Sequence, residues 1–468
     1  MKKSLIFGAA LLALGFVSCS EDNTMGIPQV NPQGPVLDGT GIEVKAEAAL
    51  EGNSVDLNQY ESTGLVPVAT LTSQNEAYDN SAYLVMELSS KEDFSNMTEL
   101  KVTDGNVSVT EWNTYFRKVL GASPKPKTMY ARIAAYASVD GQKIRIGSVD
   151  NYYLAKTLTV TPLPAEFEIE ENYYITGTVN NWALDTANPM VHTDVDIFVD
   201  PVFTYTVYLN DAQAAAGWSW KAVPQTALEE GGDGSNGVIG AAGGDTSELN
   251  GKLVAGAESG AITLTEAGSY LISINLKTMT YSIFKVVSTP GASNGWSQSA
   301  SSLLVCYDKE KKLYRGFAHL SGEFKISEAF NWDATNYGDG GDGKLSTDDG
   351  AGNLKVAADG LYWVTADLKN LTYTVTPISS LGAIGDMNGW GSQTAMTPSL
   401  DYPSWTGDVS FTTGISWKFR MNDNWDINLG GAQYDLSVGG DNLSAPGNGD
   451  YEVTLYLGLP YRYFTQLK

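Results

Sequence analysis

The stretch "GLYWVTADLKNLTYTVTPI" (residues 360–378) alternates apolar and polar side chains on both sides of a short polar segment. Because successive side chains of a strand point to opposite faces of a sheet, this period of two predicts two strands joined by a tight turn. The same design recurs at "GSYLISINLKTMTYSIFKV" (268–286), where Asn275 takes the place of Asp367, and, with an altered turn, at "GDYEVTLYLGLPYRYFTQL" (449–467). The recurrence indicates an all-β chain built from repeated units.

Each of these hairpins closes a longer unit, and the units define a first repeat (165–286), a second repeat (287–378) and a third repeat (379–468). Each repeat opens with an Asn-rich turn that ends in Trp, namely "VNNW", "SNGW" and "GDMNGW". Each continues with a strand that carries a Lys, a Gly/Asp-rich loop and the final hairpin. About a hundred residues of short strands is the size of a single β-sandwich, so three tandem sandwiches are predicted.

Residues 41–163 form a separate unit ahead of the repeats. The stretches "SAYLVMELSS", "TMYARIAAYASV" and "KIRIGSVDNYYLAK" have the alternation and the β-branched or aromatic content of strands. The stretch "VTEWNTYFRKVLGA" (109–122) is predicted to be a helix, with Gly121 as its stop signal. Its large apolar residues share one face: Trp112, Tyr115, Phe116 and Val119. We expect an immunoglobulin- or fibronectin-like sandwich that carries one helix.

The N-terminus has the features of a secretory signal. "MKKSLIFGAALLALGFVSCS" combines two Lys, an apolar run and small residues before Cys19, and it is too short for a spanning helix. "FVSCS" resembles the lipobox of bacterial lipoproteins, which implies a signal peptide at 1–18 and a lipid on Cys19; an ordinary signal peptide is the alternative. The following "SEDN" resembles the surface-export signal of Bacteroidetes lipoproteins. Residues 19–40 are rich in Gly, Pro and Asn and are predicted to be a flexible tether.

The composition excludes several classes of function. The formal net charge is −25, and so acidic a surface disfavours nucleic acid, whose phosphates attract Lys and Arg clusters. With only two His, no His-rich metal site, no His-based catalytic triad and no cofactor are expected. Cys306 lies in a strand-like stretch and is expected to be a buried apolar residue. Only 18% of the residues are charged while aromatic and neutral polar residues abound, which suits a hydroxyl-rich ligand such as a sugar.

The second and third repeats share a set of aromatic and polar residues at matched spacing. In both, a Trp follows the Lys by seven residues, and the Trp of the opening turn precedes that Lys by 29 or 28 residues. In both, an Asn stands nine residues before an aromatic residue of the final hairpin. The set is Trp296, Lys325, Trp332 and Asn353 in the second repeat, and Trp390, Lys418, Trp425 and Asn442 in the third.

This set has the chemistry of a carbohydrate site. Pyranose rings pack their C–H faces on flat indole faces, which bury a large area at low entropic cost. Lys donates hydrogen bonds and Asn both donates and accepts them, so both can bind adjacent hydroxyls. If Phe324 and Phe419 face the core, the neighbouring Lys325 and Lys418 point outward. Two Trp at an angle make a curved surface, which favours a helical α-1,4-glucan over a flat β-glucan.

The pattern resembles that of starch- and glycogen-binding modules, including the glycogen-binding module of the AMP-activated kinase beta subunit. A lipoprotein with an N-terminal sandwich and several such modules in series is similar to the SusE/SusF-type proteins of Bacteroidetes starch-utilisation systems, and three modules are closer to the F type. The resemblance implies a non-catalytic protein, lipid-anchored in the outer membrane and facing the cell exterior, that binds starch or maltooligosaccharides. A porin-like transporter and other glycan-binding lipoproteins are the partners that it implies.

The first repeat departs from this pattern. Trp182 and Lys221 match, but the position seven residues after Lys221 is Leu228, and no Asn fits the position of Asn353 and Asn442. Trp218 and Trp220 could substitute for the missing Trp, or they could belong to the core. The first repeat is therefore expected to bind weakly, to bind differently or not to bind.

Several alternatives compete with this interpretation. A Trp in a sandwich is usually a core residue, as we expect for Trp363 and Trp417, and the Lys residues could instead protect strand edges. "YGDGGDGKLSTDD" (337–349) suggests Ca²⁺ but lacks the EF-hand pattern, so a flexible loop is favoured there and at "EEGGDGSNG" (229–237). A glycosidase needs two carboxylates across a cleft, but no acidic pair recurs between the repeats. A structural or adhesive surface protein, or a binder of another glycan, are the alternative functions.

Overall fold

The structure is a computed structural model of the chain. It describes residues 36–74, 81–139, 141–148, 150, 152–165, 167–230, 237–399 and 403–468. The predicted signal peptide, Cys19 and most of the predicted tether lie outside these residues. The end of the predicted tether forms a strand, in which Val36 pairs with Arg145. The chain divides into two compact units, Met1–Trp112 with Pro126–Thr161 and Asn113–Lys125 with Pro162–Lys468.

The N-terminal sandwich is built around one long strand, β9. Its strands are β1 (Val36–Leu37), β2 (Ile42–Ala46), β3 (Ser54–Asp56), β4 (Leu65–Pro67), β5 (Ala69–Ser73), β6 (Ala82–Ser89), β7 (Thr98–Lys101), β8 (Asn106–Ser108), β9 (Lys127–Val139), β10 (Gln142–Ile146) and β11 (Leu154–Thr161). Strand β9 pairs with β6 on one side and with β10 and β11 on the other. The stretch that we predicted as one strand at 143–156 is two, because the chain turns at Gly147, whose φ of 85° favours glycine.

Helix α2 (Val109–Leu120) confirms the predicted helix. All four apolar residues of its predicted face are buried: Trp112, Tyr115, Phe116 and Val119. Gly121, with a φ of 86°, ends the helix, and its amide donates to the Arg117 carbonyl at 3.0 Å. Three shorter helices lie outside the prediction: α1 (Ala48–Glu51), α3 (Asp211–Ala216) and α4 (Gln225–Glu229).

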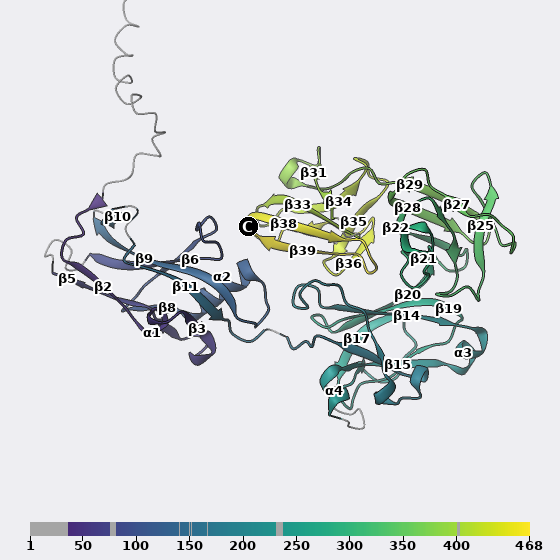
Figure 1. The fold of residues 1–468 in the computed structure, drawn as a ribbon, viewed down its shortest axis with the longest axis horizontal. Coiled ribbons are helices and arrows are strands. Elements are labelled where there is room, and N and C mark those ends of the chain that lie inside the picture. Colours follow the sequence, from purple (N-terminus) through teal and green to yellow (C-terminus); the bar gives the residue numbers. More distant parts are fainter. Residues whose placement is uncertain are drawn as a thin grey trace, which may run out of the picture. The chain divides into compact units, whose positions relative to one another are not determined.

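The repeats are made of short strands in the predicted order and each ends in the predicted hairpin (Figure 1). The first repeat contains β12 (Tyr173–Gly177), β13 (Asn188–Pro189), β14 (Val202–Leu209), β15 (Trp218–Pro224), β16 (Ile239–Ala241), β17 (Asn250–Ala255), β18 (Ile262–Leu264), β19 (Gly268–Asn275) and β20 (Thr280–Ser288). The second contains β21 (Leu303–Asp308), β22 (Leu313–Leu320), β23 (Glu323–Phe324), β24 (Ile326–Ser327), β25 (Asn336–Gly341), β26 (Lys344–Ser346), β27 (Leu354–Lys355), β28 (Gly360–Asp367) and β29 (Thr372–Pro377). The third contains β30 (Leu381–Gly385), β31 (Thr394–Ala395), β32 (Thr397–Pro398), β33 (Ser404–Phe411), β34 (Ser416–Met421), β35 (Asn428–Ala432), β36 (Asp435–Val438), β37 (Leu443–Ser444), β38 (Gly449–Tyr456) and β39 (Arg462–Leu467).

The turns of the first two hairpins explain why Asn275 and Asp367 occupy the same place. The Oδ1 atom of Asn275 accepts hydrogen bonds from the amides two and three residues ahead, at 3.0 and 3.1 Å. Asp367 does the same at 3.1 and 2.8 Å. Short polar side chains that bond to the following amides favour tight turns, so this position sets where each hairpin reverses.

The repeats share hydrogen bonds and core. Strand β20 runs past the predicted boundary at residue 286 and pairs with β21, so the first and second repeats contribute to one continuous sheet. Phe317 of the second repeat packs against Tyr461 of the third, with ring centroids 5.3 Å apart. The domain boundaries that we predicted within residues 165–468 therefore fall inside one compact unit, and the division of that unit into three modules stays a prediction.

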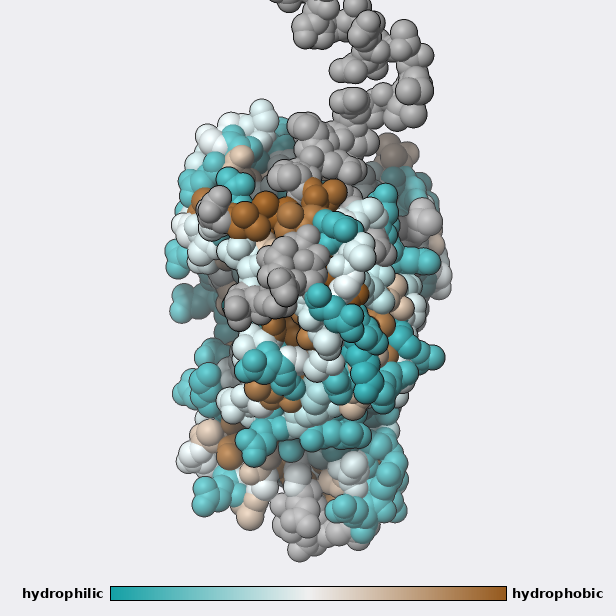
Figure 2. Space-filling model, turned by 90° about the vertical axis from the view of Figure 1, so that its left-hand side faces the viewer, coloured by the Kyte–Doolittle hydropathy of each residue, from teal (hydrophilic) through white to brown (hydrophobic). Residues whose placement is uncertain are grey.

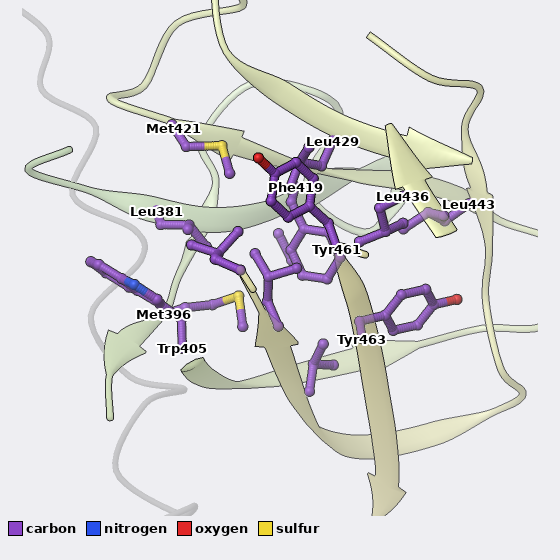
Figure 3. Close-up of a cluster of buried hydrophobic side chains, with 14 of the residues drawn as sticks. Leu381, Met396, Trp405, Phe419, Met421, Leu429, Leu436, Leu443, Tyr461 and Tyr463 are labelled. Atoms are coloured by element: carbon purple, nitrogen blue, oxygen red, sulfur yellow. The ribbon is translucent and has the colours of Figure 1, made fainter. Parts of the chain in front are cut away.

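The core of the third repeat lies between the sheet that contains β34 and the sheet that contains β38 and β39. Figure 3 shows Phe419 and Tyr463 among the side chains gathered there, and their ring centroids lie 5.6 Å apart. Trp417 and Trp363 are buried, which confirms their predicted core roles. Because side chains alternate along β34, Lys418 and Arg420 point to the face opposite Trp417 and Phe419.

The face of the molecule drawn in Figure 2 is largely hydrophilic or neutral, with apolar residues gathered in small patches. No helix in the described part of the chain is long and apolar enough to cross a membrane. Cys306, which we expected to be buried, is only half-buried in β21, and that partial burial raises the pKa of its thiol.

Candidate functional site

The Trp of each opening turn is held in the same unusual backbone conformation. A strand runs into a short 3-10 helix, η3 (Thr178–Asn180), η5 (Ala292–Asn294) or η6 (Asp386–Asn388), and the next two residues are left-handed. The φ angles are 63° at Trp182, 63° at Trp296 and 58° at Trp390. A left-handed residue with a side chain costs about 1–2 kcal/mol, so its surroundings must enforce it.

An Asn in each turn helps to hold the Trp in this left-handed backbone conformation. Its Oδ1 atom accepts from the amide of the Gly three residues earlier, at 2.9, 3.1 and 2.9 Å in the three repeats. The Trp amide donates to the carbonyl of the same Gly at 2.9, 2.8 and 2.9 Å. The asparagines are Asn180, Asn294 and Asn388, and the glycines are Gly177, Gly291 and Gly385. The Asn-rich turn is thus a structural device that presents an indole.

The Gly of each turn is required by space, because it lies directly against the neighbouring strand that carries the Lys. A Cβ atom at this position would collide with a backbone carbonyl of that strand. The contact would be 2.1 Å to Ser219 at Gly177, 2.5 Å to Glu323 at Gly291 and 2.3 Å to Ser416 at Gly385.

We expect Gly385→Ala to destabilise the third repeat, since the added methyl group must push the turn away from β34. Overpacking of this kind costs about 1–3 kcal/mol. Gly360→Ala is the matched control, because a Cβ atom there meets nothing within 4 Å. Urea denaturation of the two variants measures the difference, and equal midpoints would contradict the steric argument.

In the second and third repeats a second Trp stands beside the first. The ring centroids of Trp296 and Trp332 lie 6.4 Å apart with planes tilted by 40°, and those of Trp390 and Trp425 lie 6.0 Å apart with a tilt of 34°. Trp332 is 47% exposed and Trp425 is 46% exposed, so neither is a core residue. We name the two sets, each with its Lys and Asn, the second-repeat platform and the third-repeat platform.

Strand pairing brings the Lys and Asn of each platform side by side. Phe324 pairs with Leu354 in an antiparallel ladder. The next pair in the same register is Lys325 with Asn353, so these two residues lie side by side. Trp417 pairs with Leu443, which places Lys418 next to Asn442 in the same way. Strand β34 is paired on both sides, so Lys418 does not protect a sheet edge as the alternative interpretation required.

Both Lys ammonium groups are already partly bonded. Lys325 Nζ donates to the Ala351 carbonyl at 3.0 Å, and Lys418 Nζ donates to Asn428 Oδ1 at 3.1 Å. Lys325 Nζ also donates to the Gly352 carbonyl at 3.5 Å. An ammonium has three donors, so at least one is left on each Lys for a ligand. Asn353 Nδ2 donates to Glu323 Oε2 at 2.8 Å, and this bond, followed by the ion pair with a neighbouring Lys, lowers the pKa of Glu323.

The third-repeat platform has supports that sequence reasoning missed. Asp386 Oδ1 accepts from Trp390 Nε1 at 2.7 Å while its Oδ2 atom accepts from the Ser416 amide at 2.8 Å. These bonds, the one from the Ser416 amide first, lower the pKa of Asp386. Asn428 donates to the Trp425 carbonyl at 3.0 Å and so connects that Trp to Lys418. The Asp in "GDMNGW" was a visible signal for the first of these supports, because the corresponding residue of the second repeat is Ala292.

The first repeat keeps the turn but not the platform. Trp182 is exposed, and Lys221 Nζ donates to the Ser259 carbonyl. Trp218 and Trp220 are buried in the core, so they do not substitute for a second exposed Trp.

Two further differences separate the first repeat from the others. Leu228, at the position of the second Trp, lies in α4 and packs against a small apolar cluster that contains Val223, Ala227 and Val238. The pairing of Trp220 with Ile262 places Ala261 opposite Lys221, where the other repeats have Asn. The first repeat therefore offers one exposed indole without the partners that define the two platforms.

The Gly/Asp-rich stretch at 337–349 is not simply a flexible loop, as we had favoured. Strands β25 and β26 form a hairpin there, and it turns through Asp342 and Gly343, both with positive φ. Six residues of the other such stretch, 231–236, lie outside the described residues. No group of three or more His, Cys, Asp or Glu that could hold a metal ion occurs among the residues that the structure describes.

Comparison with known proteins agrees with the sequence resemblance. Residues 168–285, almost the whole first repeat, match the family model described as "SusF, first starch specific CBM", where CBM denotes a carbohydrate-binding module. The crystal structure of SusF from Bacteroides thetaiotaomicron matches over 88% of this chain and 97% of that chain, at 16% identity and a TM-score of 0.29. No curated protein matches the sequence. The family match confirms the predicted resemblance to SusF-type proteins for residues 168–285.

Proposed function

We propose that this chain is a non-catalytic glycan-binding protein that holds starch-like α-1,4-glucan at the cell surface through the second- and third-repeat platforms. The observation that carries the proposal is the recurrence of a tilted Trp pair at two places, with tilts of 40° and 34°. In each pair one indole is exposed and the other is half-buried. The match of the first repeat to a starch-specific module family supports the choice of glucan.

The platform geometry suits a coiled glucan. Successive glucose units of an α-1,4-linked chain are rotated relative to one another. Their apolar faces can therefore each pack on one indole of a pair whose ring planes are tilted. Lys325 or Lys418 then donates to ring hydroxyls, and Asn353 or Asn442 both donates and accepts at the adjacent hydroxyl. A flat β-glucan would contact only one indole of each pair at a time.

Two platforms on one chain gain from a polymeric ligand. Once one platform has bound, the second meets the same polymer at high effective concentration, and overall avidity can exceed either affinity by roughly 10²–10⁴. A lipid on Cys19, with residues 19–40 as tether, would hold both platforms at the outer membrane. The chain would then retain polymer for neighbouring hydrolases and for a porin-like transporter.

The test is affinity electrophoresis of the full chain, produced without the lipid, in native gels that contain amylopectin, dextran or a mixed-linkage β-glucan. We expect strong retardation by amylopectin, release by added maltoheptaose, and no retardation by the other two polymers. Retardation by dextran or by β-glucan alone would support a binder of another glycan. Unretarded migration in all three gels would favour a structural or adhesive protein.

A further inference from the structure

A single buried arginine touches both Trp-bearing loops of the third repeat. Arg420 lies in β34 two residues after Lys418, so the two side chains share a face. Arg420 is only 6% exposed, and a guanidinium that is so deeply buried must be bonded on several sides to be tolerated.

The partners of Arg420 belong to the two walls of the platform. Nε donates to Gln393 Oε1 at 3.0 Å, and Nη2 donates to the Gly391 carbonyl at 3.4 Å, directly after Trp390. Nη2 also donates to Asp423 Oδ1 at 3.4 Å, two residues before Trp425. The guanidinium carbon lies 5.4 Å from the centroid of the Trp425 ring, within the range of a cation–π contact.

The loop that carries Trp425 needs such support. Asn422 and Asp423 are consecutive left-handed residues, with φ of 52° and 53°. Each costs free energy and persists only where its surroundings hold it in place. Asn422 is fixed by bonds to the chain at Pro377 and Ser379, at 2.8 Å each. Asp423 is held by its hydrogen bond from Arg420, whose side chain lies on the same face of the strand as Lys418.

We propose that Arg420 is a positioning residue that fixes the angle between Trp390 and Trp425, so that the third-repeat platform is formed before ligand arrives. This inference rests on the proposed function. The corresponding residue is Ser327 in the second repeat and Val223 in the first, both buried and neither able to reach two loops at once. A preformed site loses less entropy on binding, so the third-repeat platform binds more tightly than the second.

The experiment uses the full chain with Trp332→Ala, in which the second-repeat platform is disabled and the third reports binding. Arg420→Met is added because it keeps an unbranched apolar stem and removes the fork of donors. We expect affinity for maltoheptaose, measured by calorimetry, to fall about tenfold. Arg315→Met is the matched control, since Arg315 also lies over an aromatic ring, that of Tyr307, away from both platforms.

A second readout separates positioning from binding. Indoles about 6 Å apart couple electronically and give a circular dichroism couplet, isolated as the difference between the parent and its Trp425→Ala derivative. We expect Arg420→Met to reduce this couplet in the absence of ligand and Arg315→Met to leave it unchanged. If Arg420→Met does not fold, Arg420→Lys is measured instead.

Unchanged couplet and affinity in the folded Arg420 variant would overturn the positioning role. A parent that does not bind maltoheptaose at all would instead contradict the proposed function, while the couplet would still decide whether Arg420 sets the angle. The inference is supported if Arg420→Met reduces both the circular dichroism couplet and the affinity for maltoheptaose while Arg315→Met changes neither.

Discussion

Replacing Trp332 and Trp425 together by Ala is expected to abolish retardation of the chain in amylopectin gels. Each substitution removes one wall of a platform and leaves a single indole, which is the state of the first repeat. Loss of a central aromatic contact typically costs 2 kcal/mol or more of binding free energy, about 30-fold in affinity for each platform. With both platforms weakened, the avidity on a polymer is lost as well.

The same double variant should remain folded, because both side chains are close to half exposed. Substitution of exposed residues usually changes the free energy of unfolding by no more than about 0.5 kcal/mol. Tyr307→Ala is the matched control, since Tyr307 is an exposed aromatic residue outside both platforms. A melting temperature that falls by several degrees would mean that the two Trp stabilise the fold, and undiminished retardation would refute the platforms as the binding sites.

The local part of the fold was predictable from sequence. The hairpins follow from period-two alternation, and helix α2 follows from the spacing of Trp112, Tyr115, Phe116 and Val119. The Lys-to-Trp spacing was informative for a similar reason, since Lys418 and Trp425 lie on one strand and the loop that follows it. Patterns within ten residues or so carry enough information to fix a strand, a turn and the residue that ends it.

Contacts between distant segments were not predictable in this way. Nothing in the sequence around Arg420 indicates that Gln393 and Asp423 will meet it, and a buried Arg resembles a solvated strand residue until its neighbours are placed. The pairing of β20 with β21 was missed because the repeat pattern suggested a boundary at residue 286. The absence of a platform in the first repeat was visible as Leu228, but the role of α4 there was not.

Arg462→Met is expected to be the most destabilising of the substitutions considered. Arg462 and Asp200 are 262 residues apart in sequence, and their side chains are 2% and 0% exposed. Arg462 Nε and Nη2 each donate to a carboxylate oxygen of Asp200 at 2.7 Å, and Thr193 Oγ1 also donates to Asp200, at 2.6 Å. Removing the guanidinium leaves a buried carboxylate without its counter-charge, which costs about 3–5 kcal/mol.

The control is the double variant Asp200→Asn with Arg462→Met, which removes both charges at little change of volume. It should recover much of the lost stability, because the penalty comes from the unpaired charge and less from the pair itself. Lys309→Met is the surface comparison, since its ion pair with Glu266 is exposed and contributes about 1 kcal/mol or less.

Thermal unfolding followed by calorimetry tests whether this buried ion pair joins the repeats into one cooperative unit. Asp200 belongs to the first repeat and Arg462 to the third, so the pair ties the two ends of the compact unit that carries both platforms. The repeats should therefore unfold in one transition in the wild type, and Arg462→Met should lower its midpoint by roughly 4–7 °C. Independent transitions for the repeats in the wild type, or a single variant as stable as the double, would show that the buried pair does not join them. In that case the two platforms would meet a glucan as separate modules, and the avidity gain would depend on the flexibility between them instead of on a fixed spacing.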